Sequence, residues 1–120
     1  MAKILIVDDD IQTTALIESL VKFSNHEPYS VNESKNALKT AENIQPDLIL
    51  LDIMMAEING IALCKLIKST PELAHIPVIM VSALDDIGSK KDSANAGAID
   101  YITKPLMANS FAAKLKAVLG

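Results

Sequence analysis

The sequence predicts an α/β fold in which one parallel sheet of five strands is covered by helices on both faces. Short aliphatic runs alternate along the chain with longer stretches in which apolar residues recur at helical spacing. The runs lack the polar alternation of a half-exposed sheet, so both faces of the strands should be buried. This alternation favours right-handed βα units wound on both sides of the sheet, in a single domain that spans residues 1–120.

The predicted strands are short and rich in β-branched or aliphatic residues. Four runs meet this description well: Lys3–Val7, Asp47–Leu51, Pro77–Val81 and Ala98–Thr103. A weaker run, Pro28–Val31, is predicted as the remaining strand.

The predicted helices lie between these runs, and each presents one apolar face. A more polar, alanine-containing stretch over Asp85–Ala96 is predicted as a further helix that stops at Gly97. The apolar faces of the others consist of Ile11, Ala15, Ile17, Leu20 and Val21; of Ala37, Leu38, Ala41 and Ile44; of Ile61, Leu63, Cys64 and Ile67; and of Phe111, Leu115, Val118 and Leu119.

The composition narrows the class of protein. The single cysteine, Cys64, cannot form an internal disulfide and is expected to be a buried thiol. The chain is acidic, with a net charge of −4, and contains no arginine, so direct nucleic-acid binding is not expected. The apolar run at the N-terminus is too short for a signal peptide or a membrane span, which predicts a cytoplasmic protein without a membrane partner.

Polar residues follow the predicted strands at their carboxyl ends, where ligands bind in sheets of this kind. Any one of them alone has an ordinary explanation, as a helix cap, a turn residue or a solvated charge. Together they are Asp8, Asp9 and Asp10 after the first strand, Asp52 after the third, Ser82 after the fourth and Lys104 after the fifth.

A cluster of carboxylates repels itself unless a cation is bound, so this set predicts a metal site. Carboxylates with water suit Mg²⁺, a hard cation that prefers oxygen ligands. A zinc site is not expected, because there is one cysteine and because His26 and His75 lie in predicted loops, where we expect them to face solvent.

Four segments carry a resemblance to a known family: ILIVDDD, PDLILLDIMMAEING, IPVIMVSA and GAIDYITKP. In this order and spacing they resemble the receiver domains of response regulators in two-component signalling, over essentially the whole chain. The resemblance implies a flavodoxin-like (βα)5 fold. It also implies a signalling phosphoacceptor that assists its own phosphoryl transfer and dephosphorylation, rather than an enzyme.

The resemblance also implies a role for each site residue. Asp52 is the phosphoacceptor and Lys104 contacts the phosphoryl group. Mg²⁺ is held by Asp9, Asp52 and the backbone carbonyl of Met54, with Asp8 acting through water. Ser82 is the switch hydroxyl and Tyr101 the aromatic that turns inward after transfer. The Lys104–Pro105 peptide is expected to be cis. The implied partners are a sensor histidine kinase or phosphotransfer protein and an unknown output domain or protein.

Two features of the chain bear on this resemblance. In the loop after Asp52 the family often has proline, glycine and aspartate where this chain has Ala56, Glu57 and Asn59. The missing proline puts the stiffness of that loop in question. The residues two beyond Asp52 and two beyond Ser82 are Met54 and Leu84, which would flank an attacking water in receivers and cannot orient it, so we expect a long-lived acyl phosphate.

Three other classes fit parts of the pattern. A haloacid-dehalogenase-like phosphatase also has an Asp-x-Asp after its first strand, but it expects threonine or valine where this chain has Gln12, and a cap domain for which there is no room. A flavin- or nucleotide-binding protein is disfavoured because acids, not a glycine-rich loop, follow the first strand. A receiver that is never phosphorylated and serves only as an interaction module is the remaining alternative.

Overall fold

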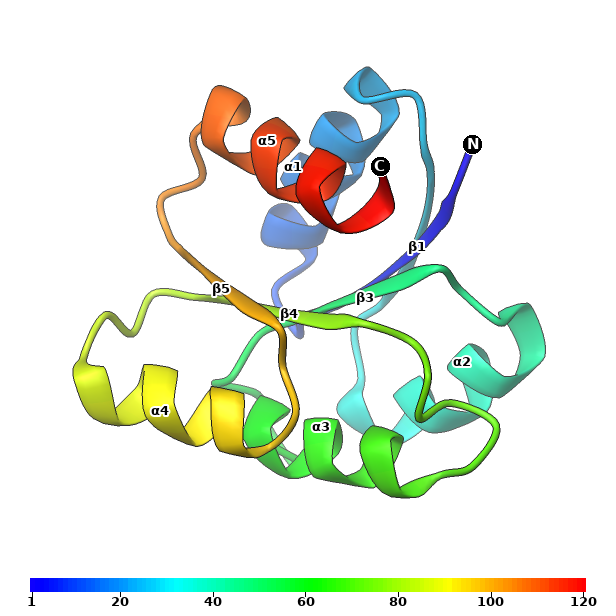
Figure 1. Ribbon diagram of the computed structural model, residues 1–120, viewed down its shortest axis with the longest axis vertical. Coiled ribbons are helices and arrows are strands. Elements are labelled where there is room, and N and C mark those ends of the chain that lie inside the picture. The colour runs from blue at the N-terminus through cyan, green and yellow to red at the C-terminus, as the bar shows by residue number, and fades with distance from the viewer.

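The computed structural model describes all 120 residues and contains five strands that alternate with helices (Figure 1). The elements are β1 (Lys3–Val7), α1 (Ile11–Phe23), β2 (Glu27–Val31), a short 3₁₀ helix η1 (Ser34–Asn36), α2 (Ala37–Ile44), β3 (Leu48–Leu51), α3 (Gly60–Ser69), β4 (Val78–Ser82), α4 (Ile87–Asn95), β5 (Asp100–Thr103) and α5 (Ala108–Leu119). The predicted α/β class and all five strands are confirmed, with boundaries that differ by at most two residues.

The strands form one parallel sheet in the order β2-β1-β3-β4-β5, which is the flavodoxin-like order. The chain moves outward from β1 to β2 on one side, then crosses to β3 on the other, so strand order reverses between β1 and β3. Val7 pairs with Leu51 across these two strands. The residues that follow them, Asp8 and Asp52, therefore emerge side by side.

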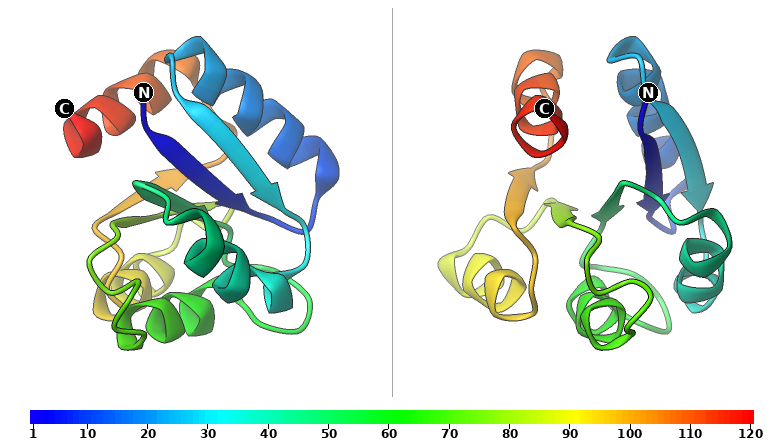
Figure 2. Two further views of the ribbon diagram at one scale, coloured as in Figure 1. Left: turned by 90° about the vertical axis from the view of Figure 1, so that its right-hand side faces the viewer. Right: turned by 45° about the vertical axis from the view of Figure 1, so that its right-hand side comes forward.

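Helices cover both faces of the sheet, as predicted. Helices α1 and α5 lie on one face and α2, α3 and α4 on the other (Figures 1 and 2). Alternate strand residues supply two separate apolar clusters, with Ile4 and Ile6 on the α1/α5 side and Leu5 and Val7 on the other. None of the helices combines the length and the apolar composition that a membrane span requires.

The predicted apolar face of α1 is partly wrong. Ile17 and Val21 are buried as expected, but the third buried residue is Thr14, whereas Ile11 is 70% exposed and Ala15 is also exposed. Ala15 follows Thr14 by one residue and so points about 100° away around the helix. The buried Thr14 hydroxyl is satisfied locally, because it donates to the Ile11 carbonyl at 2.9 Å.

The bounds of α4 are set by a capping residue at its start and a glycine after its end. The helix begins at Ile87, two residues later than predicted, because Asp86 caps its N-terminus by accepting from the Ser89 amide at 2.9 Å. Gly97, with φ +109°, ends the turn after the helix, as predicted. Ser82 is the last residue of β4 rather than the first residue after it.

Candidate functional site

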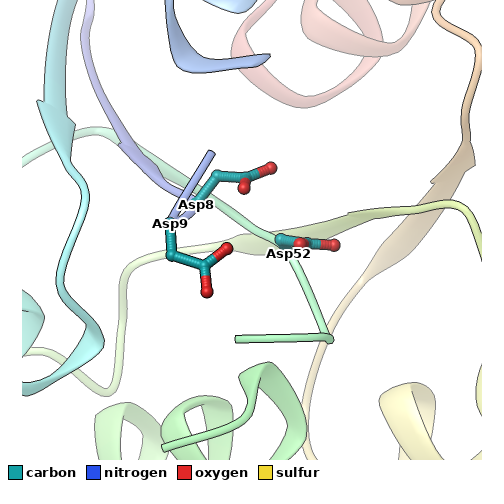
Figure 3. Close-up of side chains that lie close together, drawn as sticks. All are labelled: Asp8, Asp9 and Asp52. Carbon is teal, nitrogen blue, oxygen red and sulfur yellow. The ribbon is translucent and has the colours of Figure 1, made fainter. Parts of the chain in front are cut away.

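Three carboxylates meet at the carboxyl ends of β1 and β3. Each of Asp8, Asp9 and Asp52 offers an oxygen within 4.8 Å of the others, and Figure 3 shows the three side chains close together. Asp8 is 2% exposed and Asp52 is 8% exposed, whereas Asp9 lies at the surface. The β1–β3 pairing thus brings together residues more than forty positions apart in the chain.

One cation reaches this cluster from the end of β5. The ammonium group of Lys104 lies 3.0 Å from Asp8 Oδ2 and 3.7 Å from Asp52 Oδ1. The Lys104 amide donates to the Ser82 carbonyl at 2.8 Å, which joins this position to the end of β4. The Lys104–Pro105 peptide is cis, as the resemblance implied.

The electrostatics of the cluster show a surplus of negative charge. Burial, with a further contribution from Asp8, raises the pKa of Asp52 from 3.8 to about 6, although Lys104 acts in the opposite direction. One lysine therefore does not balance three carboxylates. A divalent cation would, and the donor set of carboxylate oxygens fits a hard ion such as Mg²⁺.

The predicted switch residues are linked through one backbone segment. The hydroxyl of Ser82, which is 1% exposed, accepts from the Leu84 amide at 3.2 Å. The hydroxyl of Tyr101 donates to the Leu84 carbonyl at 2.6 Å, and the Lys90 ammonium lies 5.9 Å from the centre of the half-buried Tyr101 ring. Leu84 is thus bonded to both residues, while a rotation of Tyr101 stays a prediction.

Asp10 does not join the cluster, although it follows the same strand as Asp8 and Asp9. Its carboxylate caps α1, accepting from the Gln12 amide at 3.1 Å and from the Thr13 hydroxyl at 2.6 Å. The Thr13 bond is the main reason why the pKa of Asp10 lies below its usual value. The ordinary explanation for an aspartate after a strand is therefore correct here.

Neither histidine belongs to the acidic cluster. His75 is exposed, as predicted. His26 is only half-exposed, and its Nδ1 accepts from the Ala2 amide at 3.0 Å, so the expectation of a solvent-facing loop residue was only half right. Cys64 is fully buried, as predicted, and burial raises the pKa of its thiol.

Two residues that the sequence did not single out, Asn32 and Ser34, bind backbone groups of the segments that carry the acids. Asn32 Nδ2 donates to the Asp8 carbonyl at 2.9 Å and to the Thr14 hydroxyl at 3.1 Å. Ser34, which is 2% exposed, donates to the Ala56 carbonyl and accepts from the Ile58 amide. Serine and asparagine after a strand are common turn residues, so the sequence held no signal for these contacts.

One of the three acids, Asp9, borders a groove at the surface. An open groove of about 670 Å³ lies between the loop that follows Asp52 and the first turns of α3, and Asp9 and Met54 line it. The Met54 side chain is 65% exposed. The groove thus reaches the cluster only at Asp9, because the buried Asp8 and Asp52 do not line it.

Comparisons with known proteins agree on one family. Residues 4–116 match the family model of the response regulator receiver domain. The polar-differentiation response regulator DivK of Brucella anthropi is 34% identical over 117 residues, which are 98% of this chain and 95% of that protein. The response regulator PleD of Caulobacter vibrioides is 36% identical over 105 residues, which are 88% of this chain but only 23% of PleD.

The solved structures give the same result. A putative response regulator from Chloroflexus aurantiacus superposes with a TM-score of 0.93 at 29% identity, over 98% of this chain and 97% of that one. The chain thus spans nearly the whole of some relatives but less than a quarter of PleD.

Proposed function

The chain belongs to the response regulator receiver family, and we propose that it accepts a phosphoryl group on Asp52 and transmits this event as a change in its surface. The observation that carries the proposal is the buried Asp52 carboxylate, which lies beside two further acids and within 3.7 Å of the Lys104 ammonium. Phosphoryl transfer needs this kind of positioning and charge neutralisation more than it needs covalent help from the protein.

Asp52 would act as the nucleophile. Its carboxylate oxygen attacks phosphorus, the bond from phosphorus to the donor's leaving atom breaks, and an acyl phosphate forms on Asp52. With a pKa of about 6, the carboxyl group is mostly ionised at neutral pH and therefore available for attack. Lys104 would place its positive charge against the incoming phosphoryl oxygens.

The same cluster of acids would hold Mg²⁺. We assign Asp9, Asp52 and the Met54 carbonyl as its ligands, with Asp8 contributing through water. When bound, Mg²⁺ would neutralise the carboxylates and the charge on the phosphoryl oxygens. Asp8 also keeps Lys104 in place through their contact at 3.0 Å.

Ser82 and Tyr101 would convert phosphorylation into a change of surface. The Ser82 hydroxyl would turn to donate to a phosphoryl oxygen, and its link through Leu84 would carry this movement to Tyr101. Tyr101 lies on β5, so the surface formed by α4, β5 and α5 is the one we expect to change.

The proposed partners follow from the same chemistry. A sensor histidine kinase or a phosphotransfer protein in the cytoplasm would supply the phosphoryl group. An output domain or separate protein would bind the α4-β5-α5 surface, and no direct contact with nucleic acid or membrane is proposed.

The alternatives are not favoured. A phosphatase of the haloacid-dehalogenase type would need the second acid of its Asp-x-Asp pair at the reaction centre, but Asp10 caps α1 instead. An interaction module that is never phosphorylated would not need the acids and Lys104 to converge on one point.

The test is to incubate the protein with acetyl phosphate and Mg²⁺ and to follow intact mass. Wild type should gain the mass of one phosphoryl group, whereas Asp52→Asn should gain none. Asp92→Asn is the matched control, because Asp92 is an exposed aspartate on α4, and it should react as wild type does. Equal phosphorylation of Asp52→Asn and wild type would exclude Asp52 as the acceptor.

A further inference from the structure

The loop between β3 and α3, residues 53–59, carries an unusual backbone turn beside the acids. Glu57 has φ +71°, and the Ile58 amide donates to the Ala56 carbonyl at 2.9 Å. These features describe a γ-turn with positive φ, the rarer and more strained of the two kinds. The loop contains neither glycine nor proline, so its own residues do not favour this conformation.

The ends of the loop are fixed by its close approach to the strand. The Gly60 amide donates to the Ile53 carbonyl at 2.8 Å, and a Cβ on Gly60 would lie 2.0 Å from the Asp52 carbonyl oxygen. Only glycine fits there. The middle of the loop, Met54–Ile58, packs against the core through Met55 and Ile58 but makes no backbone hydrogen bond to β3.

Ser34 supports the middle of the loop from η1. Its hydroxyl donates to the Ala56 carbonyl at 2.9 Å and accepts from the Ile58 amide at 3.1 Å, so the two bonds bracket Glu57. A serine hydroxyl can donate one bond and accept another, so both can exist together. The side chain is 2% exposed, so water does not compete freely for these bonds.

The turn held by Ser34 contacts the acidic cluster directly. The Ala56 amide donates to Asp9 Oδ2 at 3.1 Å, while the Ala56 carbonyl is the group that Ser34 binds. Asp9 is exposed and makes no ion pair, so this bond is the contact that orients its carboxylate. A path of bonds therefore runs from Ser34 through the Ala56 backbone to Asp9.

We propose that Ser34 is a positioning residue for the phosphoacceptor site, because it holds the turn at Ala56–Ile58 and, through it, the Asp9 carboxylate. This inference rests on the proposed function. Ser34 touches neither the phosphoryl group nor Mg²⁺, and acts by keeping their ligands in place.

The first test compares Ser34→Ala with Ser93→Ala. Ser93 is a matched control, since it is also a buried serine, 1% exposed, whose hydroxyl donates to a backbone carbonyl, that of Ser89 at 2.8 Å. The affinity for Mg²⁺ alone is measured by titration of backbone NMR shifts. Ser34→Ala should bind Mg²⁺ about tenfold more weakly, as is typical when a residue behind a metal ligand is lost, and Ser93→Ala should bind as wild type does.

The second test asks whether the effect passes through the turn. Glycine adopts positive φ without strain, so Glu57→Gly added to Ser34→Ala should restore part of the lost affinity. Amide hydrogen exchange without metal provides a readout independent of phosphorylation, and the Ala56 and Ile58 amides should exchange faster in Ser34→Ala only. The phosphorylation rate of Ser34→Ala should approach that of wild type at saturating Mg²⁺.

The inference is overturned if Ser34→Ala loses stability as Ser93→Ala does but keeps the wild-type affinity for Mg²⁺ and slow exchange at Ala56 and Ile58. The proposed function fails separately, if wild type takes no phosphoryl group from acetyl phosphate. In that case the exchange of the two amides still decides whether Ser34 holds the turn.

Discussion

Two groups of aspartates lie at the same edge of the sheet, and they differ in the number of hydrogen-bond donors and cations that face each carboxylate. In the loop that leads to α4, Asp85 contacts the Lys90 ammonium at 2.7 Å, and Asp86 accepts from the Ser89 amide and hydroxyl. These hydrogen bonds lower the pKa of both carboxyl groups. In the acidic cluster the pKa of Asp52 is instead raised to about 6.

The difference separates the acids that stabilise the fold from the acids of the candidate site. Each carboxylate near α4 is exposed and has its own donors, so it stabilises the helix start or the loop. The cluster of Asp8, Asp9 and Asp52 combines burial, mutual repulsion and a single lysine, so ionised Asp52 is expected to cost stability in the absence of a cation. A carboxyl group whose pKa is perturbed by burial and by neighbouring charges is typical of a functional site.

The largest effect that we expect is a pH-dependent change in the free energy of unfolding when Asp52 is replaced. Because the pKa of Asp52 is higher in the folded than in the unfolded chain, its contribution is most favourable below pH 3.8 and is lost as pH rises through about 6. Asp52→Asn should therefore stabilise the metal-free protein at pH 8, by up to about 3 kcal/mol, and have little effect at pH 4. Urea unfolding with a chelator measures this.

The control for that measurement is Asp85→Asn. The pKa of the Asp85 carboxyl group is lowered, chiefly by the hydrogen bond with Lys90. The contribution of Asp85 to stability is therefore present above pH 3.8 and is lost at lower pH. The variant should be no more stable than wild type at pH 8. If both substitutions stabilise the protein equally, the contrast between the two groups is wrong.

The next effect is the response to Mg²⁺. At a hundredfold excess over the dissociation constant, a ligand stabilises the folded state by about 2.7 kcal/mol, which raises the melting temperature measurably. Asp9→Asn should reduce this increment, and Asp86→Asn should leave it unchanged. An increment that is undiminished in Asp9→Asn would contradict Asp9 as a ligand.

A smaller effect concerns the lifetime of the phosphorylated state. Met54 is 65% exposed and Leu84 is half-buried, and neither side chain can orient a water behind phosphorus. The nearby acid Asp85 is engaged by Lys90 and Thr103. Met54→Asn combined with Leu84→Glu should therefore lose its phosphoryl group about tenfold faster, because the new groups can position water.

Loss of the phosphoryl group is followed by intact mass after removal of the donor. The single variant Met54→Leu is the control, because it changes the side chain without adding a polar group. Decay of the double variant at the wild-type rate would show that these positions do not control water access.

The smallest expected effect is a shift of backbone NMR signals when a beryllofluoride mimic is added with Mg²⁺. Signals of Tyr101 and of the α4-β5-α5 surface should move, because Leu84 is bonded to both Ser82 and Tyr101. The same addition to Asp52→Asn should produce none of these shifts. Changes confined to the loops around Asp52 would contradict a propagated switch.

The sequence by itself determined the architecture and most of the site. Strand and helix patterns depend on the periodicity of neighbouring residues, so runs such as Lys3–Val7 were predicted with the bounds that the structure has. In a parallel sheet the residues after each strand share one edge. The convergence of Asp8, Asp52 and Lys104 could therefore be predicted from their places after strands.

Only the tertiary structure decided which polar residues serve that site and which serve the fold. The family resemblance singled out Asp9, but position after the strand alone did not distinguish it from Asp10, a helix cap, because the difference lies in side-chain direction. The sequence also held no sign of Ser34, whose partners lie 22 and 24 residues away. Contacts of this length depend on how η1 packs against the loop after β3, and no local pattern in the chain encodes that packing.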